Sequence, residues 1–305
     1  MQIDVVSPHF FYMEVESEDS TSYDAKYGTY HLNGEMRVKK NPSTISKEED
    51  FIRSVDSTLQ LLPEDKRNIL IYIHGMWAHR DFFQEEVLTR FREDVLSEGS
   101  SSYGLVISVI WHAGMNYFEN AKHALTVGKH YSPIVDEVLG LEVESISVIC
   151  HSMGNRVFQG IIKNIDKPRQ ADPRIDKAIL IAADLEENIF QEGQPLAEIG
   201  KYVKSPIVYV HNNDRSLGMS KALNENDRLG LNADTETIVN NSIIKIIDVS
   251  TVDDNEGFGP SISNHRYFYT SPTVRQDLYY TLHGKDNPQR KNLDTPRRQK
   301  LTRVK

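Results

Sequence analysis

A serine whose neighbours suit a nucleophile stands at position 152, in the segment SVICHSMGNRVF. An apolar run precedes Ser152 and a helical pattern follows it, so we expect a sharp turn from strand to helix there. Such a turn exposes the hydroxyl and directs the amide of Met153, with the helix N-terminus behind it, at the position where an oxyanion would form. The turn needs small neighbours. Gly154 meets that need, and Cys150 replaces the first glycine of a G-x-S-x-G motif with a compact side chain.

The hydroxyl of Ser152 needs a histidine base and a carboxylate that fixes the tautomer of that base. His265 stands late in the chain, in the segment NHRYFYTSP. Asp184 and Asp214 each follow an apolar run, and the chain order serine, acid, histidine fits either of them. The alternative interpretations are a plain helix cap for Ser152 and a solvated loop residue for His265.

The elements that would position these side chains are visible as continuous apolar runs of strand length. The runs cover residues 68–73, 104–110, 145–150, 177–183 and 206–211, and a sixth begins at residue 242. Runs of this kind are typical of strands buried on both faces of a parallel sheet. Helical patterns alternate with them, including residues 117–139, which we expect Pro133 to divide. We therefore predict an α/β fold with a mostly parallel twisted sheet, helices on both faces, and the four candidate residues at the carboxyl edge.

Both ends of the chain differ from this pattern. Asn33-Gly34 predicts a tight turn within an N-terminal β-hairpin (residues 1–45) that packs on a single domain of residues 1–284. A capping box of Ser46 and Glu49 then predicts a helix start, and Ser271 with Pro272 predicts the start of the last helix. Residues 285–305 carry eight basic and two acidic side chains and few apolar ones, so we expect a disordered tail.

Five segments together resemble α/β-hydrolases: ILIYIHGMW, ISVICHSMGNRV, ILIAADLEENIF, IVYVHNNDRSL and NHRYFYTSP. More narrowly, they resemble a bacterial α/β-hydrolase family of unassigned substrate with an H-S-M-G-N nucleophile elbow, over residues 68–284. The resemblance implies Ser152 as nucleophile, His265 as base and Asp214 as acid. It also implies that the loop of His74 and Gly75 supplies a second oxyanion donor, most directly the amide of Met76.

Asp184 remains the alternative acid, because some hydrolases of this fold take the carboxylate from the earlier strand end. Asp184 lies in an acidic run with Glu186 and Glu187, so it is equally suited to cap a helix or line the pocket. We favour Asp214 for its position in the triad order. The remaining candidates for lining a substrate pocket are His74, Trp77, Trp111 and His151, with core packing as the alternative for the aromatic residues and a structural role for His151.

No cofactor or metal site is predicted. The histidines at positions 74, 79, 112, 123 and 130 do not have zinc-ligand spacing, and the chain has no glycine-rich phosphate loop. Cys150 is the one cysteine, and the N-terminus lacks a basic start and an apolar run, so we expect a cytoplasmic protein. The net charge of −9 argues against nucleic-acid binding by the main body, although the basic tail could contact RNA or an anionic surface.

These observations predict a serine hydrolase acting on a small carboxylic ester or thioester through an acyl-enzyme. The same residues would also serve an amidase, a peptidase or an acyltransferase. The competing hypothesis is a non-catalytic binding protein of the same fold, which the missing glycine at Cys150 favours. The sequence discloses neither the substrate nor the oligomeric state.

Overall fold

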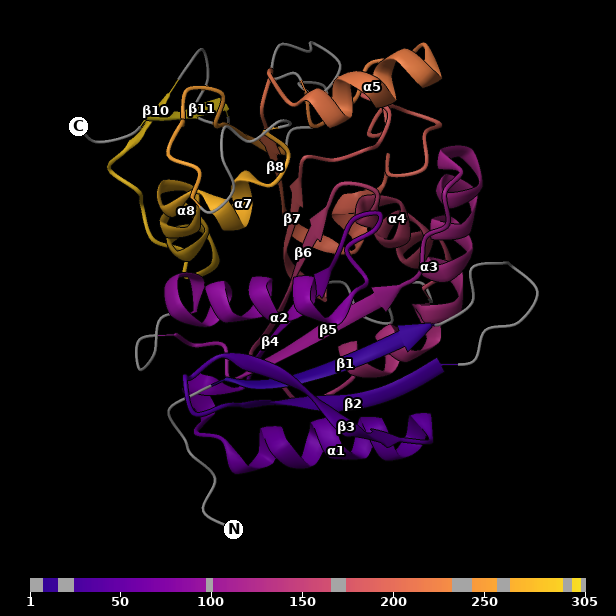
Figure 1. Ribbon diagram of the computed structural model, residues 1–305, viewed down its shortest axis with the longest axis vertical. Helices are drawn as coiled ribbons and strands as arrows, with labels where there is room; N and C mark the ends of the chain where they lie inside the picture. Colours follow the sequence, from indigo (N-terminus) through magenta and orange to yellow (C-terminus); the bar gives the residue numbers. More distant parts are fainter. Residues whose placement is uncertain are drawn as a thin grey trace.

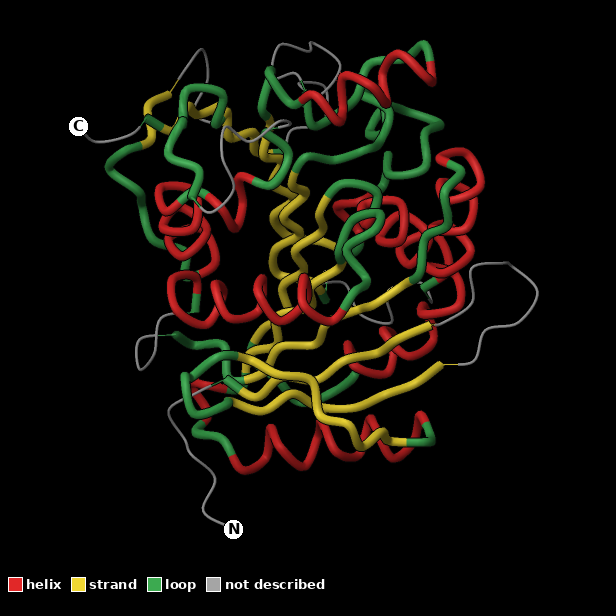
Figure 2. The backbone as a smooth tube through the Cα atoms, viewed as in Figure 1, coloured by secondary structure: helices red, strands yellow, loops and turns green. Residues whose placement is uncertain are grey.

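The protein is built on one 11-stranded sheet with the strand order β10-β11-β9-β8-β7-β6-β4-β5-β1-β2-β3 (Figures 1 and 2). The computed structural model describes residues 8–15, 25–96, 101–165, 174–231, 243–256, 264–292 and 298–302. The strands are β1 (His9–Val15), β2 (Ala25–Leu32), β3 (Val38–Ile45), β4 (Asn68–Ile73), β5 (Leu105–Trp111), β6 (Ser145–His151), β7 (Ile175–Ile181), β8 (Val203–Val210), β9 (Lys245–Asp248), β10 (Arg290–Asn292) and β11 (Arg298–Leu301). Strands β1, β4 to β9 and β11 join their neighbours in parallel, and antiparallel pairs occur only at the two edges.

Helices cover both faces of the sheet. They are α1 (Glu48–Leu61), α2 (Asp81–Arg90), α3 (Tyr117–Leu139), α4 (Gly154–Asn164), α5 (Arg215–Asn224), α7 (Tyr267–Thr270) and α8 (Pro272–Leu282), with short helical turns η1 (Glu64–Lys66), η2 (Phe91–Val95) and η3 (Ile199–Lys201). Side chains of α1, α3 and α4 share one core layer, and those of α2, α7 and α8 share the other. Within the described residues, no helix is long and apolar enough to span a membrane.

The predicted α/β architecture is confirmed, because all six apolar runs form strands of the central sheet. Every residue of β4 and β5 is buried, as continuous apolar runs between two helical layers require. The predicted hairpin is also confirmed as β2 and β3, and β1 extends the sheet beside β5. Its turn is wider than two residues: Asn33 accepts amides of Glu35 and Arg37 through its side chain, and Met36 takes the left-handed conformation.

Two local predictions about helices were wrong. Helix α1 begins after Lys47, and no side chain caps it, so Ser46 and Glu49 form no capping box. Helix α3 continues through Pro133 without a break. Pro133 cannot donate to the carbonyl of Lys129, and the hydroxyl of Ser132 donates to that carbonyl instead, at 2.8 Å.

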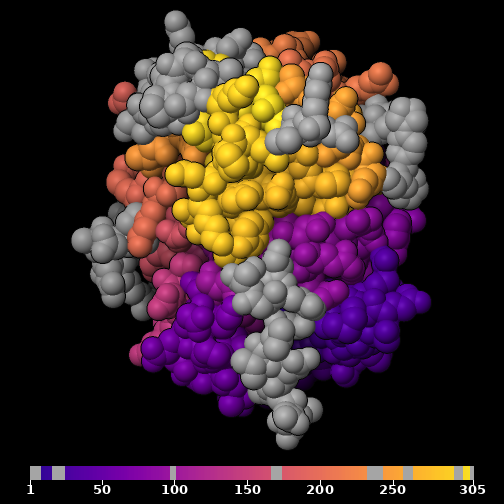
Figure 3. Space-filling model, turned by 90° about the vertical axis from the view of Figure 1, so that its left-hand side faces the viewer, coloured from indigo at the N-terminus to yellow at the C-terminus, as the bar shows by residue number. Residues whose placement is uncertain are grey.

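The basic C-terminal segment differs from the expected disordered tail, because residues 290–292 and 298–301 form β10 and β11 beside β9. Figure 3 shows these C-terminal residues in yellow, on the part of the surface remote from the indigo N-terminal strands. Arg290 binds the fully buried Asp277 of α8 with N–O distances of 2.6 and 2.8 Å. Sequence composition pointed to solvation of this arginine, whereas a buried carboxylate on α8 anchors it.

We expect Arg290→Ala to lower the free energy of unfolding by about 3–5 kcal/mol, because it leaves Asp277 buried without a counter-charge. Lys291, the exposed next residue of β10, is the matched control, and Lys291→Ala should change stability by less than about 0.5 kcal/mol. Urea unfolding of both variants measures the difference. Equal small effects would mean that the C-terminal strands do not contribute to the fold in solution.

Candidate active site

Ser152 lies on the tight turn between β6 and α4, in a strained backbone conformation. Its φ of 53° is in the left-handed region, which a serine adopts only where the surroundings hold it. Gly154 permits the turn, because a Cβ at that position would lie 2.3 Å from the carbonyl oxygen of His74. Cys150 stays in strand register opposite Ile73 and Leu180, with its side chain in the core. The absent glycine therefore does not prevent the turn.

The thiol of Cys150 has no nucleophilic character in this environment. Burial raises its pKa well above the ordinary value, so the group stays protonated.

Asn155 stabilises the turn through hydrogen bonds to backbone carbonyls, a role that we did not predict from the sequence. Its side-chain amide donates to the carbonyl oxygens of Ser152, Cys150 and Ile181, at 2.9, 3.3 and 3.4 Å. These bonds tie the end of β6 to the end of β7. The only signal in the sequence was the place of Asn155 directly after Gly154 in the elbow segment.

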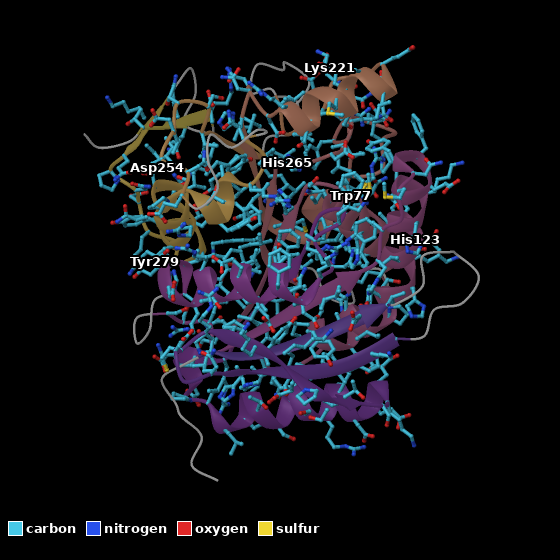
Figure 4. The ribbon with its side chains drawn as sticks, viewed as in Figure 1. Trp77, His123, Lys221, Asp254, His265 and Tyr279 are labelled. Carbon is cyan, nitrogen blue, oxygen red and sulfur yellow. The ribbon has the colours of Figure 1, made fainter. Side chains whose placement is uncertain are left out.

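The structure brings Ser152, His265 and Asp214 into one hydrogen-bonded chain. Nε2 of His265 lies 2.8 Å from Oγ of Ser152, and Nδ1 of His265 lies 2.6 Å from Oδ2 of Asp214. The other oxygen of Asp214 accepts the amide of Leu217 at 3.0 Å, at the N-terminus of α5. An ionised Asp214 that accepts Nδ1–H leaves Nε2 free to take the serine proton. Figure 4 shows His265 in the upper middle of the view.

Asp184, the second candidate acid, does not reach His265. Its carboxylate accepts the hydroxyls of Tyr117 at 2.8 Å and Ser220 at 2.5 Å. Its backbone amide donates to the carbonyl oxygen of Ser152 at 3.3 Å, so the residue still lies beside the elbow. The structure therefore places Asp214, and not Asp184, against the histidine.

The loop after β4 passes directly over the serine. A Cβ on Gly75 would lie 2.8 Å from Cβ of Ser152, so only glycine fits. Among the described residues, no backbone group accepts a hydrogen bond from the amide of Met76 or Met153. Both amides adjoin the turn, as an oxyanion site requires.

His74 fixes the direction of the Met76 amide. The amide of Trp111 donates to Nε2 of His74 at 3.0 Å, so the proton of this neutral ring sits on Nδ1 and is donated to the Gly75 carbonyl at 2.6 Å. In a trans peptide the carbonyl and the following N–H point in opposite directions, so holding the Gly75 oxygen also orients the Met76 N–H. Burial lowers the pKa of His74 to about 3, which keeps the ring neutral.

This buried histidine predicts acid sensitivity of the fold. Below pH 6.5, His74 is protonated in the unfolded chain, whereas in the folded protein it stays neutral down to about pH 3. The free energy of unfolding therefore decreases as the pH falls from 6.5 to about 3. Urea unfolding between pH 6 and pH 4 measures this effect. In His74→Asn, the free energy of unfolding should fall less steeply with decreasing pH, by at most about 1.4 kcal/mol per pH unit. The exposed His31 is the control: if His31→Asn flattens the profile as much, the buried ring is not the cause.

Three of the four pocket candidates are buried in the protein, and their place in a substrate pocket stays a prediction. His74 and Trp111 are fully buried, and the indole of Trp111 donates to the His74 carbonyl at 2.9 Å. His151 is buried as well, and its Nε2 donates to the backbone carbonyl of His265 at 2.9 Å, which positions the histidine. Of these four candidates, Trp77 alone is open to solvent, at 49% exposure.

Backbone strain is concentrated around these residues. Within the described segments, positive φ values away from glycine occur at Ser152, Trp77, Ala182 and Asn264, and otherwise at Met36 and Glu225. The first four are the turn serine, the loop over it, the end of β7 and the residue before His265. Strain of this kind accumulates where surrounding contacts fix a functional geometry.

Comparison with known proteins gives a family match. Residues 52–281 match the model of a family described as alpha/beta hydrolase of unknown function (DUF900). A search of curated proteins finds no significant match.

Similar solved structures include a candidate cell surface hydrolase from Lactobacillus plantarum WCFS1, at 12% identity and a TM-score of 0.40, covering 73% of this chain and 94% of that one. Phospholipase PlaB from Legionella pneumophila has 15% identity and a TM-score of 0.27, over 68% of this chain and 45% of that one. This chain therefore matches less than half of that phospholipase. Likenesses this distant carry no argument about substrate.

Proposed function

The chain belongs to this family of α/β-hydrolases, and on that premise we propose that it is a serine hydrolase that cleaves a carboxylic ester or thioester. The family model covers most of the protein and includes Ser152, Asp214 and His265. The observation that carries the proposal is the 2.8 Å contact between Ser152 and His265, which is continued by the 2.6 Å contact to Asp214. A serine that serves only as a helix cap has no need of a histidine on its hydroxyl.

In the proposed reaction, Oγ of Ser152 attacks the substrate carbonyl carbon while Nε2 of His265 takes the hydroxyl proton. The amides of Met153 and Met76, with Gly75 allowing their approach, stabilise the tetrahedral oxyanion. His265 then returns the proton to the leaving alcohol or thiol, and an acyl-serine remains. Water attacks the acyl-serine with His265 again as base, which releases the acid and restores the enzyme.

Amide hydrolysis and acyl transfer use the same groups and remain alternatives. A binding protein without catalysis is the other alternative, but no side chain blocks the turn at Cys150, which removes its main support. The predicted cytoplasmic location, the single-domain boundaries and the binding of an anionic surface by the C-terminal segment stay predictions.

The direct test is hydrolysis of p-nitrophenyl esters of graded acyl length, together with covalent labelling by a fluorophosphonate probe. We expect ester turnover and stoichiometric labelling of the native protein. A folded protein that neither labels nor turns over any ester of the series would contradict the proposal. A protein that labels but transfers the acyl group to an added alcohol or amine would favour an acyltransferase.

A further inference from the structure

We propose that Arg228 and Arg156 bind an anionic group of the substrate, a carboxylate or a phosphate, beside the nucleophile elbow. The proposal rests on the proposed hydrolase function and names the class of ester that the site accepts. It starts from Arg228, which lies before Leu229 on the segment that follows α5 and is fully buried. Among the residues that the structure describes, none offers a hydrogen-bond partner to any of its three guanidinium nitrogens.

Two other arginines with little exposed side-chain surface, Arg275 and Arg290, have acceptors for their guanidinium groups. Arg290 binds both oxygens of Asp277, and Arg275 donates to the carbonyl of Tyr269 at 2.7 Å and to Glu256 at 3.2 Å. Burying a guanidinium without acceptors is costly, because its hydration is lost and nothing replaces it. Arg228 differs from these two arginines, because all three of its guanidinium nitrogens lack an acceptor within the described residues.

The nearest charge cannot supply that acceptor. Asp184 lies 3.9 Å from Nη1 of Arg228 and 3.8 Å from Nε of Arg156. Within the described segments, this Nε has no hydrogen-bond partner. Both separations exceed a direct hydrogen bond. The oxygens of Asp184 already accept the hydroxyls of Tyr117 and Ser220. One carboxylate thus faces two guanidinium groups, which leaves an excess of one positive charge and several unused donors.

The cluster adjoins the proposed nucleophile. Arg156 lies in the first turn of α4, four residues after Ser152. The segment of Arg228 runs along the residues after β7, where the amide of Gly230 donates to the Ala183 carbonyl at 3.1 Å. Arg156 retains 14% exposure of its side chain, so the cluster has an open side there. An ester held at Ser152 could therefore extend an anionic group to this cluster.

The chemistry of the donors selects the ligand. A guanidinium presents a planar fork of N–H donors that matches the two oxygens of a carboxylate or phosphate. The N-terminus of α4, an 11-residue helix, adds positive potential at the same place. A substrate acid would fill the unused donors and neutralise the excess charge. We therefore infer an ester whose acyl or alcohol part carries a carboxylate or phosphate.

The test compares two esters of equal chain length, 4-nitrophenyl butyrate and 4-nitrophenyl hemisuccinate. The ratio of kcat/KM for the anionic ester over the neutral ester should fall about 10- to 100-fold in Arg228→Met and in Arg156→Gln, because charged hydrogen bonds are lost. Lys221→Gln removes one positive charge from the exposed side of α5 and should leave the ratio unchanged (Figure 4). If either arginine variant folds and keeps the native ratio, the proposal fails.

A binding readout separates this proposal from the hydrolase proposal. In the Ser152→Ala protein, succinate and inorganic phosphate should each raise the melting temperature, and adding Arg228→Met should abolish the rise. Stabilisation by succinate alone assigns a carboxylate site, and stabilisation by phosphate alone assigns a phosphate site. Arg228-dependent stabilisation without any ester turnover would uphold the anion site and refute the hydrolase. Turnover of neutral esters, with neither stabilisation nor anion preference, would refute the anion site alone.

Discussion

Ser152→Ala is expected to lower kcat/KM for an ester substrate by about 10⁴- to 10⁶-fold and to abolish fluorophosphonate labelling. Within the described residues, the ring nitrogens of His265 bond Asp214 and the Ser152 hydroxyl, so no neighbouring hydroxyl or thiol can replace Ser152 as nucleophile. Cys150 cannot substitute, since its thiol is buried in the core and held protonated. Turnover of p-nitrophenyl esters and probe labelling measure the two losses independently.

Ser147→Ala is the matched control, because Ser147 is a buried serine of β6, the strand that leads into the turn, and its hydroxyl lies 2.8 Å from that of Tyr103. It should label and turn over like the native protein. Ser152→Gly tests the backbone strain at this position. Because glycine adopts a φ of 53° without strain, the free energy of unfolding of this inactive variant should exceed that of the native protein by about 1 kcal/mol. Labelling of Ser152→Ala at the native rate would place the reactive serine elsewhere.

The central sheet could be predicted because each strand is apolar on both faces, and burial between two helical layers leaves no other arrangement for such runs. The candidate site followed from the same logic. Side chains after Ile73, His151 and Val210 must meet, because parallel strands end at one edge. His265 was harder, since it does not directly follow an apolar run, and chain order and the family resemblance were the signals that pointed to it.

The supporting contacts could not be predicted, because each depends on two elements that are distant in sequence. His74 is an unremarkable histidine until the Trp111 amide, 37 residues later, fixes its tautomer. Asn155 acts on the end of β7, and Arg290 acts on α8. Arg228 carries no motif at all. It stands out only when its hydrogen-bond partners are compared with those of Arg275 and Arg290.

Asp214→Asn is expected to lower kcat by about 10⁴-fold. An amide at this position can donate to Nδ1 of His265, which favours the tautomer that carries its proton on Nε2 and so cannot accept one from Ser152. The amide also cannot stabilise the imidazolium that forms during attack. The substitution keeps the shape of the side chain, and its oxygen can still accept the amide of Leu217 at the start of α5. The loss should therefore appear in turnover and not in the unfolding free energy.

Asp184→Asn is the discriminating comparison, because both aspartates are buried at the same edge of the sheet. Asp184 contacts Tyr117, Ser220 and two arginines, so its neutralisation should cost stability while reducing neutral-ester turnover far less than Asp214→Asn. A larger loss of turnover at Asp184 would overturn the assignment of Asp214. Equal losses of turnover in two folded variants would mean that both carboxylates stabilise the charged His265. The 2.6 Å contact to Asp214 would then not be the main source of that stabilisation.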